Sequence, residues 1–168
     1  IKQIYGGFEG APDPLAWAFW GPLVGSAARV VAGPLSDKFG GARVTHWAGL
    51  GMLGATLWVT TLTSRTGLDS FPMFVAGMLT MFFFAGVGNA STFKQMPMLF
   101  EPRQAGGVIG FTAAIAAYGP FLFGMLFAAS FGAFKSATPV FYGLAAFFAF
   151  NVVLNWWMYA RRGAANPC

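Results

Sequence analysis

The stretch GPLVGSAARVVAGPLSDKFGG, residues 21–41, decides the class of this protein. It overlaps an apolar segment from Leu15 to Leu35 in which Arg29 is the only charged residue. A segment of this length can cross a bilayer, which needs about 20 apolar residues. Arg29 would then lie about two turns inside the hydrocarbon layer, where a charge costs about 3 kcal/mol and usually faces a cavity or a partner. We therefore expect an anion or a charged partner at Arg29.

The overall composition is that of an integral membrane protein. Hydrophobic residues make up 57% of the 168 residues and charged residues only 9%. A soluble domain of this size would expose large apolar patches to water. Lys and Arg outnumber Asp and Glu by ten to five, but the basic residues are scattered through the short gaps between apolar segments. Such scattering indicates membrane topology signals and argues against nucleic acid as a partner.

Few other site types are compatible with the sequence. The single cysteine, Cys168, has no second cysteine to pair with, so no disulfide framework or cysteine metal site is expected. We expect no metal and no cofactor. The chain begins at Ile1 with a polar stretch and not with a signal peptide, which suggests a fragment of a longer protein.

Five apolar segments predict an all-α membrane protein with five transmembrane helices. Such segments must satisfy their backbone hydrogen bonds internally, and they lack the alternation of barrel strands. The segments run over residues 15–35, 44–63, 71–99, 105–131 and 138–160. Most of the 23 glycines are expected to allow close helix packing, as in the run Gly49, Gly51 and Gly54, and fewer to serve a site directly.

The basic residues predict the orientation of the chain. One side carries Lys38, Arg43, Arg103, Arg161 and Arg162, and the other carries Lys2, Arg65 and Lys135. The first side is expected to be cytoplasmic. The predicted organisation is an extracytoplasmic loop end (1–14), a transmembrane bundle (15–162) and a cytoplasmic tail (163–168), in the inner (plasma) membrane.

The gap after the first segment contains a motif, SDKFGGARV at residues 36–44. An acidic residue beside a basic one, followed by two glycines and another basic residue, can clamp two helix ends through charge-assisted hydrogen bonds. This motif resembles the loop of the major facilitator superfamily that follows the second helix of each six-helix half and locks one conformation. The resemblance assigns that role to Asp37, Lys38, Gly40, Gly41 and Arg43. The alternative is an ordinary turn with solvated charges.

The position of this loop implies which part of a transporter the chain represents. If it follows the second helix of a half, the five helices are helices 8–12 of a twelve-helix fold, in the C-terminal half. One helix and the whole N-terminal half would then be missing. Such transporters bind substrate between their two halves, so this chain would hold at most half of a site.

Two further stretches narrow the family. They are AGVGNASTFKQMPMLF, residues 85–100, and GGVIGFTAAIAAYGPFLFG, residues 106–124. With Arg29 they closely resemble the nitrate/nitrite porter (NarK-type) family, from about Leu15 to Phe131. The first matches the tenth helix of that family and the second its eleventh-helix signature. A departure is the absence of a proline beside Arg29, which affects helix shape more than charge.

The resemblance implies nitrate/nitrite transport by alternating access. The guanidinium of Arg29 suits a small planar anion because it is a planar fork of donors. The implied substrate-binding residues are Arg29, Asn89, Gly110, Thr112, Tyr118 and Gly119. Asn89 and Thr112 could equally form plain interhelical hydrogen bonds. The glycines would let the backbone approach the anion or let the helix bend, and Pro120 would free a carbonyl one turn earlier.

Lys94 and His46 have two interpretations each. The long alkyl chain of Lys94 is expected to let its ammonium group reach the membrane interface. The alternative is that Lys94 lines a vestibule open to the cytoplasm. His46 is expected to be solvated or to cap a helix rather than to relay protons. No Asp or Glu lies inside the five apolar segments. Nitrate/nitrite antiport is therefore favoured over proton-coupled nitrate symport.

Two alternatives to nitrate transport are an enzyme and a transporter for another anion. An enzyme is disfavoured because no nucleophile with a base, metal cluster or phosphate loop is recognisable. A major facilitator transporter for another small anion remains the alternative, because a fold does not determine its substrate.

Overall fold

The structure is a computed structural model that describes residues 1–63 and 67–166. Within these ranges it is helical, without strands, which confirms the all-α class. Arg65 and Cys168 lie outside the described residues. The elements are α1 (Lys2–Tyr5), α2 (Pro14–Ala18), α3 (Trp20–Phe39), α4 (Gly41–Thr63), η1 (Leu68–Ser70), α5 (Phe71–Leu99), α6 (Pro102–Ala117), α7 (Gly119–Phe134), α8 (Thr138–Asn155) and the π-helical turn η2 (Trp156–Ala160).

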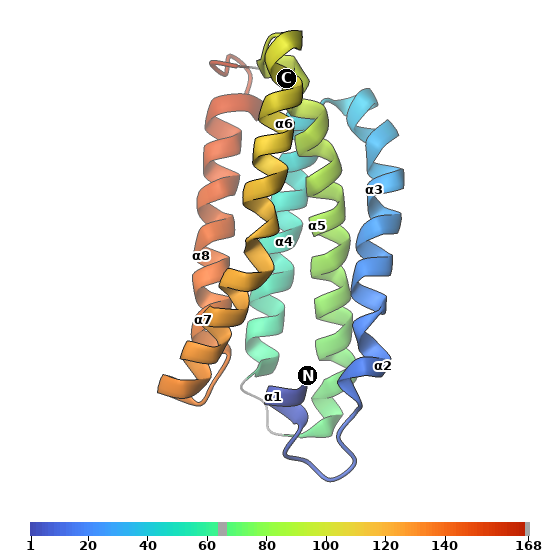
Figure 1. Ribbon diagram of the computed structural model, residues 1–168, viewed down its shortest axis with the longest axis vertical. Helices are drawn as coiled ribbons and strands as arrows, with labels where there is room; N and C mark the ends of the chain where they lie inside the picture. Colours follow the sequence, from blue (N-terminus) through green and yellow to red (C-terminus); the bar gives the residue numbers. More distant parts are fainter. Residues whose placement is uncertain (64–66, 167–168) are drawn as a thin grey trace.

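The long helices run side by side and alternate in direction (Figure 1). We call the end where α3, α5 and α8 finish the motif end, and the opposite end, which holds α1, the α1 end. The helix α4 packs extensively against α5 and α8 and also contacts α3. The pair α6–α7 contacts its neighbours much less and lies along the outside of the bundle.

Four of the five predicted membrane-spanning segments are long and apolar enough to cross a membrane. They are residues 14–39, 68–99, 102–134 and 138–160. The described helix α4 does not meet this condition, so the prediction of five spans is not confirmed for residues 44–63. The physical reason is its place in the bundle. Because α4 packs on several neighbouring helices, part of its polar surface faces protein, and Thr56 and Thr60 are buried.

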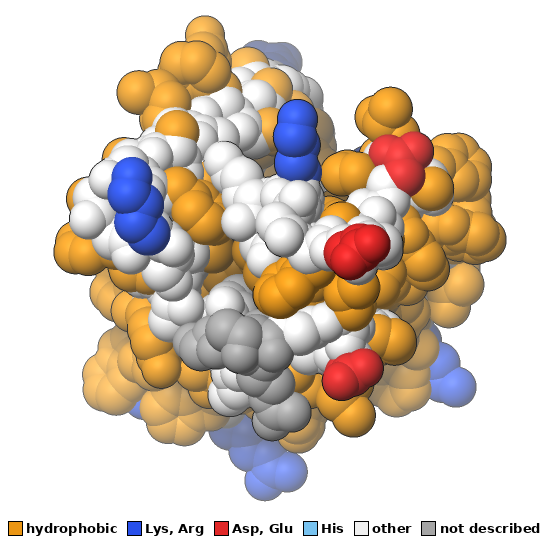
Figure 2. All heavy atoms as spheres, turned by 90° about the horizontal axis from the view of Figure 1, so that it is seen from below, with side chains coloured by type: hydrophobic (Ala, Val, Ile, Leu, Met, Phe, Trp, Pro, Cys, Tyr) orange, Lys and Arg blue, Asp and Glu red, His pale blue; other side chains and the backbone are white. Residues whose placement is uncertain are grey.

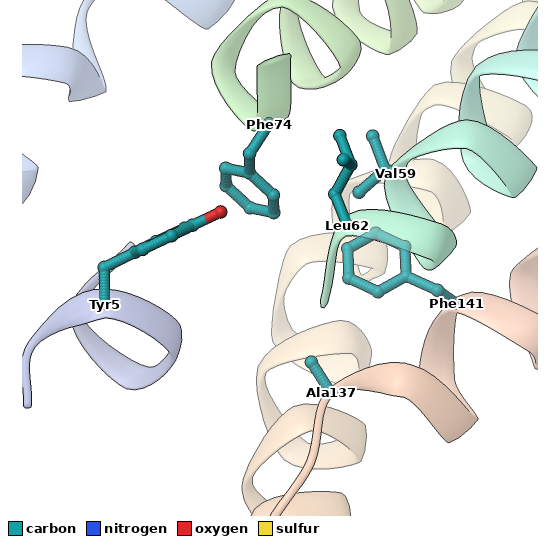
Figure 3. Close-up of a cluster of buried hydrophobic side chains, with 6 residues drawn as sticks. All are labelled: Tyr5, Val59, Leu62, Phe74, Ala137 and Phe141. Carbon is teal, nitrogen blue, oxygen red and sulfur yellow. The ribbon is translucent and has the colours of Figure 1, made fainter. Parts of the chain in front are cut away.

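A cluster of buried side chains joins the α1 end of the bundle (Figure 3). Its members come from α1, α4, α5 and the start of α8: Tyr5, Val59, Leu62, Phe74, Ala137 and Phe141. The ring of Tyr5 meets those of Phe71 and Phe74 edge-on, with centroids 5.3 and 5.4 Å apart. Its hydroxyl lies 3.2 Å from Ser70 Oγ. A hydrogen bond to the hydroxyl lets tyrosine be buried without a desolvation penalty.

Glycine allows α3 and α5 to approach each other closely. A Cβ added to Gly86 of α5 would clash with the carbonyl oxygen of Gly25 and meet Cβ of Ala28 on α3. In the predicted glycine run, Gly51 lies against the ring of Phe84, whereas Gly54 has open space around it. Gly49 lies against the side chain of Val152, so the packing interpretation is confirmed for Gly49 and Gly51 but is wrong for Gly54.

The two ends of the bundle differ in charge. The α1 end shows both acidic and basic side chains (Figure 2). They belong to the short segments at that end, which carry Lys2, Glu9, Asp13, Asp69 and Lys135. The motif end carries the basic residues Lys38, Arg43, Lys94, Arg103, Arg161 and Arg162 and the acidic residues Asp37 and Glu101. The alternation of the helices therefore gathers most of the described basic residues at one end.

Candidate functional site

Arg29 lies in the middle of α3, about 15 Å along the helix from Phe39. Its side chain is exposed, although its neighbour Ala28 is buried against α5. It follows Gly25 by one turn, so it lies one turn beyond the close approach of α3 and α5. Within the part of the chain that is described, Arg29 forms no ion pair or side-chain hydrogen bond. The structure therefore presents a charged group at mid-span without a partner among the described residues.

Asn89 lies on α5 at nearly the same level as Arg29. It follows Gly86 by three residues, and Gly86 touches α3. It precedes Thr92 by three residues, and Thr92 lines a cavity on the side of α8. On a helical wheel Asn89 lies between Gly86, which faces α3, and Thr92, which faces the cavity. Asn89 is therefore on the face of α5 between α3 and α6. In Figure 1, α5 lies between α6 and α3.

Thr112 and Gly110 lie at a similar level on α6. The helices α5 and α6 run in opposite directions and join at Phe100 and Glu101. Asn89 precedes this turn by as many residues as Thr112 follows it, so the two side chains share one level. Gly110 is exposed, and a Cβ added to it would have nothing within 4 Å. No contact inside this chain therefore requires glycine at position 110.

Tyr118 separates α6 from α7. Pro120 stands in the first turn of α7 and has no backbone N–H to offer to the preceding turn. The backbone N–H of Tyr118 donates to Ile115 O, three residues back, at 3.1 Å, and α7 begins at Gly119. The interruption is consistent with the bend expected at this proline. It lies about 10 Å along the helix from Thr112, so Tyr118 and Gly119 are not at the level of Arg29.

The predicted substrate residues are thus brought together only in part. Arg29, Asn89, Gly110 and Thr112 share one level of the bundle on three helices. No hydrogen bond joins them in residues 1–63 and 67–166. Thr112 lines a cavity of about 370 Å³ shared with α4, α5 and α8, so it faces the interior of this bundle.

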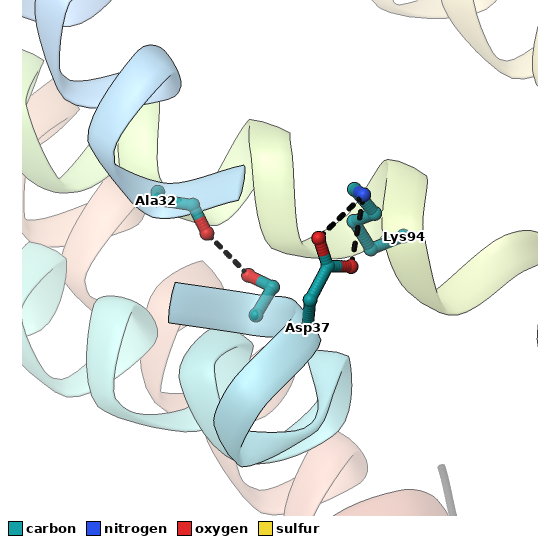
Figure 4. A network of polar contacts seen from close by, with 4 residues as sticks. Ala32, Asp37 and Lys94 are labelled. Carbon is teal, nitrogen blue, oxygen red and sulfur yellow. Dashed lines mark hydrogen bonds and ion pairs between the residues drawn. The ribbon is translucent and has the colours of Figure 1, made fainter. Parts of the chain in front are cut away.

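The motif forms a clamp between α3 and α5 (Figure 4). Lys94 Nζ of α5 lies 2.8 Å from Asp37 Oδ1 and donates to Oδ2 at 2.9 Å. Gly40 has φ +90°, which favours glycine, and it ends α3. A Cβ on Gly41 would meet Ser91 O at 3.0 Å, so the start of α4 packs directly on α5.

The two basic residues of the motif lie outside this clamp. Lys38 lies over the ring of Phe39, with Nζ 5.4 Å from its centroid. Arg43 is exposed on the first turn of α4. Asp37 thus pairs with a residue far away in sequence and not with either basic neighbour in the motif.

The structure changes the interpretation of two residues. Lys94 pairs with Asp37 instead of extending alone to the interface, because α5 carries it beside the end of α3. His46 is half-buried, and the expectation that it is solvated or caps a helix is contradicted only for one ring nitrogen. Its Nδ1 atom is buried without a hydrogen-bond partner in the described structure. The ring packs beside Trp47, with centroids 6.1 Å apart.

Sequence reasoning missed a polar network between α4 and α5. Thr45 Oγ1 lies 2.8 Å from Ser91 Oγ and donates to Gln95 Oε1 at 3.5 Å. Nearby, Asn155 Nδ2 of α8 donates to Ala42 O at 2.9 Å. The sequence feature that could have predicted this network is the four-residue spacing of Ser91 and Gln95, which places both on one face of α5. These bonds join helices and satisfy buried polar groups.

The described residues contain no group of three or more His, Cys, Asp or Glu side chains placed to hold a metal ion.

Comparison with known proteins gives consistent relatives. The chain is 63% identical, over its whole length, to a protein of Thermus thermophilus named "Probable nitrate/nitrite antiporter NarK2", and it spans 38% of that protein. It is 32% identical to "Nitrate/nitrite transporter NarU" of Escherichia coli, with 88% of this chain and 37% of the relative covered. It is 30% identical to "Probable nitrate/nitrite antiporter NarK1" of Thermus thermophilus over 61% of this chain and 26% of the relative. No family model matches.

Proposed function

Because the chain belongs to the nitrate/nitrite porter family and forms part of a multi-pass membrane protein, we propose that the full-length protein exchanges nitrate and nitrite across the membrane. The chain spans less than two fifths of the relatives that it matches, so the activity is proposed for the whole protein. The relatives are named as transporters and antiporters, which favours transport over an enzymatic function.

The observation that carries this proposal is the unpaired guanidinium of Arg29 at mid-span. Nitrate and nitrite are small planar anions whose oxygens lie in one plane. A guanidinium donates two parallel hydrogen bonds in a plane and stays protonated. Asn89 adds a neutral donor at the same level, on the neighbouring face of α5. We propose that these two residues form one wall of the substrate site.

The residues of α6 and α7 have proposed roles beside this wall. Gly110 would let the anion approach the backbone, and Thr112 would donate a hydroxyl after a small rotation of α6. The interruption at Tyr118 and Gly119 would let α7 tilt relative to α6, because the two helices are joined by few hydrogen bonds there. Alternating access would use this bend to open or close one side of the site.

The clamp between Asp37 and Lys94 is the proposed conformational lock. The pair holds the ends of α3 and α5 together at the motif end, where Gly40, Gly41, Lys38 and Arg43 shape the loop. Both side chains are about half exposed, at 49% for Lys94 and 59% for Asp37. An exposed ion pair contributes at most about 1 kcal/mol. It can therefore bias a conformational equilibrium and still open during transport.

Antiport is favoured over proton symport because the five carboxylates lie outside the apolar segments and the single histidine, His46, lies in the second turn of α4, near the motif end. A proton-coupled transporter commonly carries its proton on an intramembrane carboxylate or histidine. Proton-coupled nitrate symport and transport of another small anion are the alternatives. Competition of labelled nitrate uptake by nitrite, chlorate and small carboxylates would separate the anions.

We further propose that the chain supplies helices 8–12 of a twelve-helix protein, with residues 15–162 in the C-terminal half. The helix α4 is proposed as the fifth crossing because it connects the motif end with the α1 end. The excess of basic residues would place the motif end and the tail 163–168 in the cytoplasm, and residues 1–14 outside. In a bacterium this membrane would be the inner (plasma) membrane.

The test replaces Arg29 in the full-length protein. Arg29→Lys keeps the charge and removes the planar fork, so nitrate binding should weaken by about ten- to a hundredfold, as expected for the loss of one charge-assisted hydrogen bond. Binding is measured by isothermal titration on purified, folded protein. The matched control is Arg103→Lys, at the motif end, which should bind nitrate normally. Near-normal nitrate binding by Arg29→Lys would place the anion elsewhere.

A further inference from the structure

A basic cavity at the motif end lies apart from the proposed substrate site. It has a volume of about 350 Å³ and is lined by residues from two segments far apart in sequence. One segment is the junction of α3 and α4, with Arg43. The other is the chain that leaves η2, with Tyr159, Arg161 and Arg162. Three arginines therefore border one cavity.

These positive charges are not neutralised by carboxylates of the described chain. The ion pair found in residues 1–63 and 67–166 joins Lys94 to Asp37. Arg43, Arg161 and Arg162 have no carboxylate within ion-pair distance in those ranges. A cluster of like charges repels itself, so it is stabilised by an anion that binds between them. The cavity therefore has the charge of an anion site.

One of the three arginines is held in a fixed orientation. Arg161 Nε donates to Trp157 O at 2.9 Å, and its guanidinium lies 4.3 Å from the centroid of the Trp157 ring. These contacts occupy one donor and one face of the group. The two terminal nitrogens remain available to donate two parallel hydrogen bonds, the geometry that suits phosphate.

The wall of the cavity is held by backbone hydrogen bonds. After Arg161 the chain turns back on η2, with Ala164 N donating to Arg161 O and Asn166 N to Met158 O, both at 3.1 Å. Gly163 has φ +74°, which lets the chain make this turn. Arg162 is thus presented from an ordered turn and not from a free end.

The surroundings place the cavity at a membrane interface. Trp156 and Trp157 are 47% and 55% exposed and lie about one helical turn before Arg161 and Arg162. Tryptophans of this kind lie at the level of lipid headgroups. Basic pockets between membrane helices at this level bind phosphate-bearing headgroups. The geometry points to Arg43, Arg161 and Arg162 as a site for a phosphate group, carried by an anionic phospholipid or free in solution. This inference does not depend on which anion is transported.

The test compares the double variant Arg43→Gln/Arg162→Gln with Arg103→Gln, all in the full-length protein. Arg161 is left unchanged because its contacts with Trp157 support the fold. Native mass spectrometry measures the binding of phosphatidylglycerol against phosphatidylcholine, and isothermal titration measures inorganic phosphate. Arg103→Gln is the matched control because it removes a basic charge at the same end of the bundle without lining the cavity.

We expect the double variant to bind phosphatidylglycerol about 25-fold more weakly, roughly fivefold for each arginine removed, with phosphatidylcholine unaffected. A selective loss of phosphatidylglycerol identifies a lipid site. A selective loss of inorganic phosphate binding identifies a site for the free anion. If the double variant and Arg103→Gln bind both ligands equally, the three arginines do not form a phosphate site.

Discussion

The contact of α3 with α5 and the helix pair α6–α7 are both rich in glycine, yet the glycines do different things. At the α3–α5 contact Gly86 touches the backbone of Gly25, and Gly21 lies against the ring of Phe82. Along α6–α7, Gly110 and Gly119 have nothing within 4 Å of an added Cβ. The first pair of helices is closed by its own packing. The second has glycines that no packing within the described chain explains.

The difference teaches how to separate structural from functional glycine in this molecule. A glycine that meets a backbone carbonyl is required for the fold, because the neighbouring backbone cannot move aside. A glycine on an open helix face is available for a bend, for a ligand or for another part of the full-length protein. The same residue type therefore predicts opposite outcomes at two places.

The largest expected effect follows from breaking the packed side of this comparison. Gly86→Val would drive its side chain into Gly25 O, and overpacking of this kind costs about 3 kcal/mol or more. The full-length variant should lose much of its thermal stability in detergent, measured by tryptophan fluorescence. The control is Gly54→Val, in open space on α4, whose unfolding temperature should be close to that of the unchanged protein. Equal stabilities of the two variants would mean that α3 and α5 do not pack so closely.

The open side of the comparison gives the next effect. Gly110→Val should leave the unfolding temperature of the full-length protein nearly unchanged, because no atom of the described chain meets the new side chain. We expect nitrate binding to fall about tenfold or more, because the added methyl groups would keep the anion from the backbone. Binding is measured by isothermal titration. A loss of stability as large as that of Gly86→Val would instead show that Gly110 packs against another part of the protein.

A smaller effect is expected at the clamp that closes the α3–α5 contact. A double-mutant cycle with Asp37→Asn and Lys94→Gln should give a coupling free energy between zero and about 1 kcal/mol, because both side chains are about half exposed. The coupling should decrease at high salt. Denaturant unfolding of the four proteins measures it. A coupling of several kcal/mol would indicate a buried pair in the full-length protein.

The smallest effect is expected at Gly54. Gly54→Ala adds one methyl group in open space within a helix, which should stabilise the protein by about 0.5 to 1 kcal/mol by reducing the freedom of the unfolded chain. Thermal unfolding of the full-length variant checks this increase. A decrease would mean that α4 is packed more tightly at this position than the described structure indicates.

Much of the fold follows from the sequence, and the exceptions have physical causes. Long apolar runs predicted helices over residues 71–99 and 138–160 that begin where the structure begins them. The break at Tyr118 was predictable because Pro120 has no N–H. The helix α4 was expected to span the membrane like the others. That span is not confirmed, because α4 is not apolar enough by composition, although it runs from one end of the bundle to the other.

The candidate site was predictable to a smaller extent. Arg29 was evident because a charge inside an apolar run is costly, and its resemblance to a known motif gave it a role. The partner of Asp37 was not evident, because Lys94 lies far away in sequence and only the packing of α3 on α5 brings it close. The buried Nδ1 of His46 was also not evident, because the burial of a single side-chain atom depends on packing and not on the residue type.

The sequence by itself determined the membrane class, the helical segments, the family and the isolated charge of Arg29. These properties depend on composition and on local order, which one segment contains without reference to another. The tertiary structure decided which glycines pack and which residue pairs with Asp37. It also decided how Arg43 meets Arg161 and Arg162 at one cavity. Those properties depend on the faces that helices present to each other, and a helix face is fixed only when its neighbours are in place.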